Sequence, residues 1–109
     1  MKTRIIATLL AFGLLTHAKV TESILSIDSV GVSRNTNSIF IETKESIPQT
    51  NCSVKKLLRV NLSDPAASHI LSIAIAAQSQ EKQITVIYEN NECMASGTAI
   101  RALKVFSDK

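Results

Sequence analysis

The sequence lacks the residue patterns on which most catalytic and cofactor sites depend. It has no glycine-rich phosphate loop, no calcium-binding loop and no paired CxxC motifs, so nucleotide, calcium and structural zinc sites have no support. Histidine occurs only at His17 and His69. A hydrolytic triad needs a histidine beside a nucleophile and a carboxylate, whereas His69 is expected to be a partly solvated residue of a helix. We therefore expect no catalytic residue, no cofactor and no metal site, and a protein that is not an enzyme.

Aromatic residues are also scarce. They make up 4% of the 109 residues, with one tyrosine and no tryptophan. Single-stranded nucleic acid is usually bound by stacked aromatic rings in a basic groove. Beyond the first eighteen residues the aromatics are Phe40, Tyr88 and Phe106, of which Phe40 and Phe106 are expected in or near the core. The basic cluster at residues 55–59 is expected to be a solvated strand edge, so no nucleic-acid partner is expected.

The first eighteen residues match an export signal. Two basic residues precede an apolar stretch at residues 5–15, and Thr16-His17-Ala18 follows with small residues at the −3 and −1 positions of a cleavage site. The stretch is shorter than the roughly 20 residues that span a membrane, and this order is that of a secretory signal peptide. We expect cleavage between Ala18 and Lys19, which leaves one domain at residues 19–109, secreted or periplasmic in a bacterium and without a membrane span. Twelve Lys and Arg, less the two in the signal, leave ten against nine Asp and Glu, so the mature domain is nearly neutral.

Cysteine occurs twice, at Cys52 and Cys93. Exported proteins meet oxidising conditions, so these two thiols are expected to form a disulfide. Chain entropy gives a cross-link over this sequence separation about 4 kcal/mol of stabilisation. The alternative is a pair of free, buried thiols.

Alternation of apolar residues predicts five strands. Along residues 22–33 the alternation changes phase at Asp28-Ser29, which indicates a bulge or a sharp bend in a long first strand. The other strands are predicted at residues 39–43, 54–62, 84–88 and 100–106, with turns at residues 34–38 and 90–93.

One helix is predicted between the third and fourth strands. Ser63-Asp64-Pro65 supplies side-chain acceptors and a proline suited to a first turn, so the helix should run from about residue 65 to residue 80. Its apolar face is expected at Ala67, Ile70, Leu71, Ile73, Ala74 and Ala77. The fold is thus mainly β with one helix, in the order β-β-β-α-β-β, which is the order of the OB-fold, a five-stranded Greek-key barrel. The alternative is a small α+β sandwich.

The stretch SHILSIAIAAQSQEKQITVIYENNEC at residues 68–93 resembles the helix-strand core of small secreted bacterial OB-fold proteins. The receptor-binding B subunits of subtilase cytotoxin and pertussis-like toxins belong to this group, and the likeness covers residues 54–106. It implies an OB-fold, an intrachain disulfide and, as in the toxins, a ring of five subunits that binds host glycans. Glycan pockets present an aromatic platform beside hydrogen-bonding side chains, but this chain has a single Tyr and no Trp. No sugar-binding residue is therefore carried over.

Together these observations predict a secreted, non-catalytic binding module that recognises a glycan or a protein partner and forms a homo-oligomer if it follows the toxins. The alternative is a stand-alone periplasmic protein, structural or inhibitor-like, that acts through a loop.

Overall fold

The computed structural model describes residues 19–107, so Ala18 lies outside the described residues and Lys19 directly precedes the first strand. Six strands form one sheet in the order β1-β5-β6-β4-β3-β2, and one helix, α2 (Ala67–Ser79), packs against it. The prediction of a mainly β domain with a single helix is confirmed for this part of the chain. The strands are β1 (Val20–Leu25), β2 (Ile27–Ser33), β3 (Ser38–Thr43), β4 (Leu57–Asn61), β5 (Ile84–Met94) and β6 (Gly97–Val105).

The predicted first strand is divided at Ser26, which gives six strands instead of five. β1 pairs antiparallel with β5 and β2 pairs antiparallel with β3, so its two halves form opposite edges of the sheet. Ser26 leaves the strand pairing because its N–H donates to the carboxylate of Glu45 at 2.7 Å and its carbonyl accepts from the N–H of Lys44 at 2.9 Å. The pairing of β2 with β3 shifts register between Ile27 and Ser29, which confirms the predicted irregularity at Asp28.

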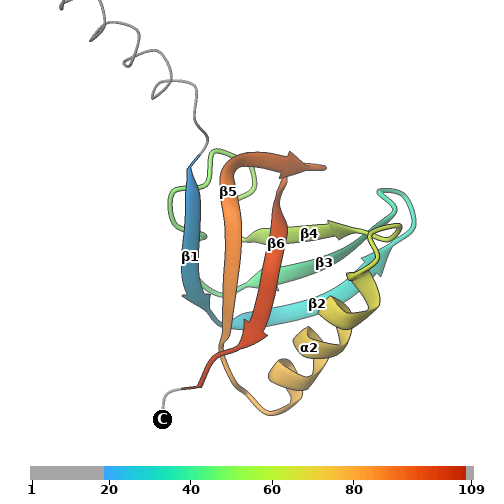
Figure 1. Cartoon of the computed structure of the whole chain (residues 1–109), viewed down its shortest axis with the longest axis vertical. Coiled ribbons are helices and arrows are strands. Elements are labelled where there is room, and N and C mark those ends of the chain that lie inside the picture. The colour runs from blue at the N-terminus through green and yellow to red at the C-terminus, as the bar shows by residue number, and fades with distance from the viewer. Residues whose placement is uncertain (1–18, 108–109) are drawn as a thin grey trace, which may run out of the picture.

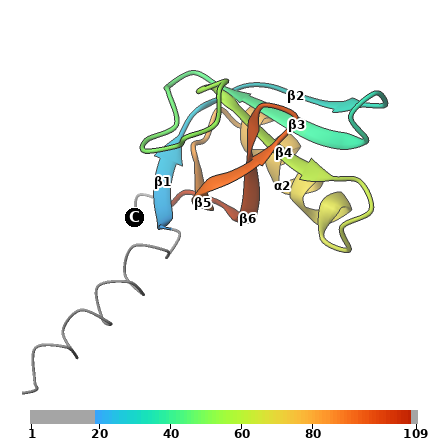
Figure 2. The same cartoon turned by 90° about the horizontal axis from the view of Figure 1, so that it is seen from above.

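The strands lie in two groups around the core. Figure 1 shows β1, β5 and β6 side by side, with β2, β3 and β4 running across behind them, and Figure 2 shows the two groups from above. A short parallel pairing, Leu58 with Thr98 and Arg59 with Ala99, joins β4 to β6. Between the groups lies a core that includes Leu25, Ile39, Ile41, Leu58, Ile84, Val86 and Tyr88.

Helix α2 packs through a narrow face of three alanines and one isoleucine. Its buried residues are Ala67, Ile70, Ala74 and Ala77, whereas Leu71 and Ile73, also predicted on this face, are only partly buried. The helix begins at Ala67, later than predicted, and no side chain caps it. The carboxylate of Asp64 instead accepts from the N–H of Ala66 at 2.8 Å, so Asp64 stabilises the turn before the helix.

Several predicted strand limits are wrong, and β6 begins at Gly97 rather than at Ile100. β4 begins at Leu57 rather than at Val54, because the N–H of Val54 donates to the carbonyl of Ser96 at 3.0 Å and holds this segment in the loop. β5 continues through the predicted turn at residues 90–93, because Asn90 donates its N–H to the carbonyl of Lys19 at 2.8 Å. The chain reverses at Ala95-Ser96 instead.

The loop at residues 44–56 is fixed to β5 by the predicted disulfide. Cys52 and Cys93 are bonded, and Cys52 is buried, with 1% of its surface exposed. Beneath the same loop the hydroxyls of Thr50 and Thr98 share a buried hydrogen bond of 2.7 Å. Among residues 19–107, no helix has the length and apolar character needed to cross a membrane.

Candidate functional site

The strongest candidate for a binding surface is the outer face of β2, β3 and β4. Successive side chains of a strand point to opposite faces of a sheet. In β3, Ile39 and Ile41 are buried in the core, so Phe40 between them points outward. Phe40 is only partly buried and is not a core residue, which corrects the prediction that placed it in or near the core.

Phe40 lies across Gly31 of the neighbouring strand. The two residues are direct partners in the pairing of β2 with β3. A Cβ atom on Gly31 would lie 2.6 Å from Cζ and 2.9 Å from Cε2 of the ring, so only glycine leaves room for the ring in this position. The absence of a side chain at Gly31 therefore allows the end of the aromatic ring to lie over this residue.

Arg59 lies on the other side of Phe40. It is the partner of Phe40 in the pairing of β3 with β4, and its guanidinium carbon is 5.9 Å from the ring centroid. Nη1 donates to the hydroxyl of Thr36 at 3.0 Å and to the hydroxyl of Ser38 at 2.8 Å. Nε is buried and has no hydrogen-bond partner within residues 19–107. Two hydroxyls thus hold the guanidinium beside the ring, and the Nε–H group of Arg59 makes no hydrogen bond within residues 19–107.

A shallow hollow of about 260 Å³ continues this surface. Glu42 and Leu57, which are paired across β3 and β4, belong to the same outward set as Phe40 and Arg59. The hydroxyl of Ser29 donates to the carboxylate of Glu42. The hollow is lined by Asp28, Glu42, Thr43, Val54, Lys56 and Leu57.

We call the surface made by Gly31, Phe40, Arg59, Thr36 and this hollow the Phe40–Arg59 face, in which the fully buried Ser38 holds Arg59 in place. It combines an aromatic ring, a fixed guanidinium, the hydroxyl of Thr36, a carboxylate and the ammonium of Lys56. Such a set can hold a polar ligand by stacking and hydrogen bonds.

The residues singled out in the sequence are dispersed. His69 is exposed on α2, apart from the Phe40–Arg59 face. The basic cluster is divided: Lys55 donates to the carbonyl of Thr50 at 2.9 Å, Lys56 borders the hollow, and Arg59 is partly buried beside Phe40. Lys55 and Lys56 are exposed as expected of a solvated segment, but Arg59 is not. Within residues 19–107, no group of three His, Cys, Asp or Glu side chains could hold a metal ion.

The sequence alone did not identify Phe40 and Arg59 as candidate binding residues, although it contains an indication that Phe40 faces outward. A phenylalanine between two isoleucines of one strand must face away from them. The pairing with Gly31 and Arg59 depends on strand register, which alternation alone did not specify. Comparison with known proteins adds no family: no protein-family model and no curated protein matches the chain.

Proposed function

We propose that this chain is a secreted, non-catalytic OB-fold binding module that recognises a glycan through the Phe40–Arg59 face. The observation that carries the proposal is the ring of Phe40, laid across Gly31 and flanked by Arg59 with its two hydroxyl partners. A sugar offers an apolar ring face and a rim of hydroxyls. It would stack on Phe40 and bond to the polar groups around that ring.

The OB-fold assignment is supported by the sheet order. Both edge strands come from one bent segment, because Ser26 alone separates β1 from β2. The single helix lies between β4 and β5, and β4 pairs parallel with β6. In OB-folds, ligands bind on the face of the second and third strands and the adjoining loops. If the bent segment counts as one first strand, that face corresponds to β3 and β4, which carry Phe40 and Arg59.

Secretion is supported by the signal-like residues 1–18 and by the disulfide between Cys52 and Cys93. The resemblance to toxin B subunits extends the proposal to a homo-oligomer. Size-exclusion chromatography with light scattering on residues 19–109 tests this part. A monomer that binds no sugar would rule out the toxin-like function.

A glycan array with residues 19–109 tests ligand recognition directly. Against the best-bound glycan, Phe40→Leu keeps apolar volume but removes the aromatic face, and should weaken binding by about tenfold or more. Gly31→Ala should also weaken it, because the new methyl group would displace the ring. Phe106→Leu makes the same change at a partly buried phenylalanine beside a different hollow, so it should leave binding unchanged.

An inhibitor-like role is the second candidate, and one observation favours it. Residues 44–56 form a loop that is exposed except at Ile47, Thr50 and Cys52 and that the disulfide fixes to β5, and Gln49 within it is exposed and has a φ of 61°. A rigid, exposed loop can dock into a partner's cleft with little loss of entropy. If the array finds no glycan and Gln49→Ala abolishes capture of a secreted protein partner, this role replaces glycan recognition.

A further inference from the structure

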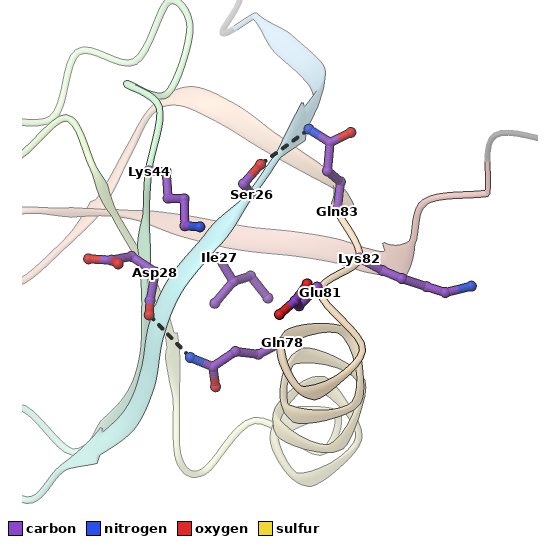
Figure 3. Close-up of a pocket in the computed structure, with 8 residues that line it drawn as sticks. All are labelled: Ser26, Ile27, Asp28, Lys44, Gln78, Glu81, Lys82 and Gln83. Atoms are coloured by element: carbon purple, nitrogen blue, oxygen red, sulfur yellow. Dashed lines mark hydrogen bonds between the residues drawn. The ribbon is translucent and has the colours of Figure 1, made fainter.

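A second, larger hollow lies where the bend of the first strand faces the C-terminal end of α2. Its volume is about 520 Å³, within the range of small-molecule sites. Ile27, whose side chain belongs to the core, forms an apolar floor. Figure 3 shows the lining residues, which are Ser26, Ile27, Asp28, Lys44, Gln78, Glu81, Lys82 and Gln83.

Two glutamine amides connect the helix end to the strand and frame the hollow. Nε2 of Gln78 donates to the backbone carbonyl of Asp28 at 3.1 Å, and Nε2 of Gln83 donates to the hydroxyl of Ser26 at 3.2 Å. In Figure 3 these two bonds lie on either side of Ile27. The distance between strand and helix end is thus held by hydrogen bonds, and the hollow exists before any ligand binds.

Two opposite charges face this hollow without pairing. The ammonium of Lys44 points into it from β3's end, and the carboxylate of Glu81 points into it from the helix end, on opposite sides of Ile27 (Figure 3). Neither residue takes part in an ion pair among residues 19–107, where the ion pairs all involve Arg101. The charged groups of Lys82 and Asp28 point away from the hollow. The hollow therefore presents one cation and one anion to a ligand.

The C-terminal end of α2 adds to the negative potential on the Glu81 side of the hollow. The last turn of α2 carries no basic residue to offset the negative end of the helix dipole. Glu81 follows the helix with a φ of 57°, a left-handed conformation that glycine usually adopts at this position. The N–H of Lys82 closes the helix on the carbonyl of Ala77 at 2.8 Å. This closure turns the side chain of Glu81 toward β2.

We propose that this hollow, the Lys44–Glu81 hollow, binds a small zwitterion of dipeptide size. The ligand's carboxylate bonds to the ammonium of Lys44, and its ammonium bonds to the carboxylate of Glu81. The apolar contact with Ile27 holds the atoms between the two charged ends. The site is separate from the Phe40–Arg59 face, although Asp28 borders both hollows. It does not depend on glycan recognition.

Titration of residues 19–109 with glycylglycine, followed by amide NMR signals, tests the proposal. Saturable shifts are expected at residues 26–28 and 78–83, and none with N-acetylglycinamide, which lacks both charges. Glu81→Gln and Lys44→Met should each weaken binding by about tenfold, because each removes one charge-assisted hydrogen bond. The exchange variant Lys44→Glu/Glu81→Lys should restore binding with the dipeptide reversed.

Matched control variants distinguish the loss of a ligand contact from a change in the net charge of the protein. Glu22→Gln and Lys104→Met make the same charge changes at residues that line a different hollow, and should leave the affinity within about twofold. The proposal is overturned if glycylglycine gives no saturable shift, if N-acetylglycinamide binds as well, or if control and site variants weaken binding alike. Each variant's amide spectrum shows whether the fold is intact.

Discussion

At the scale of single residues, Tyr88 is the buried polar group with the largest structural role. Its side chain is fully buried, and its hydroxyl donates to the carbonyl of Pro48 at 2.6 Å. That carbonyl can only accept, so the hydroxyl of Ser23, 2.9 Å away, must donate to Tyr88. One phenol thus connects β5, β1 and the loop at residues 44–56.

Tyr88→Phe should therefore lower the free energy of unfolding by about 1–3 kcal/mol, since the Pro48 carbonyl and the Ser23 hydroxyl lose their partner. Denaturant unfolding of residues 19–109 measures this. Ser23→Ala removes one of the two bonds and should cost less. A Tyr88→Phe variant as stable as the wild type would mean that water replaces the phenol at no cost.

The same tyrosine predicts a loss of stability in alkali. Burial raises the pKa of Tyr88 above its ordinary value of 10.0, and the hydrogen bond with Ser23 offsets this only in part. Above pH 10 the unfolded chain loses the phenolic proton before the folded chain does, so the free energy of unfolding falls as pH rises. Unfolding curves on both sides of pH 10 should show this decline in the wild type. Tyr88→Phe should show a smaller one.

Glu45 predicts the opposite dependence in acid. Burial acts to raise its pKa, but hydrogen bonds from Ser26 and the charge of Lys44 outweigh burial, so the pKa lies below the ordinary value of 4.5. Its stabilising effect is present above pH 4.5 and is lost as pH falls through the lowered pKa. Glu45→Gln should be less stable than the wild type at neutral pH, and the difference should shrink in acid. A difference independent of pH would show that the charge of Glu45 does not hold the bend at Ser26.

At the scale of elements, the turn between β5 and β6 is made by residue types that its backbone conformation does not favour. Ala95 and Ser96 have φ values of 46° and 73°, a conformation that glycine or asparagine adopts at lower cost. Ser96→Gly should raise the free energy of unfolding by up to about 1 kcal/mol. Ser46→Gly, at an exposed loop residue outside the positive-φ set, is the control and should bring no gain. Equal effects of the two changes would contradict a strained turn.

The elements themselves were largely predictable from sequence, and their limits were not. Alternation located the strands and the change of phase at Asp28, since burial on one face imposes a period of two. The extension of β5 past Asn90 depends on bonds to Lys19 and Asn51, which are distant in sequence. For the same reason, alternation could not show Phe40 lying on Gly31. The alternation along one strand predicts which face of the sheet each side chain occupies. The register between strands determines which of these side chains lie together in a site.

At the scale of the whole molecule, the two strand groups share few direct links. β4 and β6 pair through only Leu58 with Thr98 and Arg59 with Ala99, while the bend at Ser26, helix α2 and hydrogen bonds from the loop at residues 44–56 to β5 and β6 provide other connections. The disulfide adds a covalent link, because Cys52 lies in the loop between β3 and β4 and Cys93 lies in β5. It thus joins the two groups close to their short parallel pairing.

Loss of this disulfide should therefore weaken the whole domain rather than the loop alone. Cross-linking residues 41 apart restricts the unfolded chain, and the expected loss is about 2–4 kcal/mol. Denaturant unfolding of the oxidised protein and of Cys52→Ala/Cys93→Ala measures it. Val54→Ala, at an exposed loop residue, controls for changes in the loop that leave the cross-link intact. If the double variant unfolds at the same denaturant concentration as the oxidised protein, the disulfide contributes nothing to holding the two strand groups together.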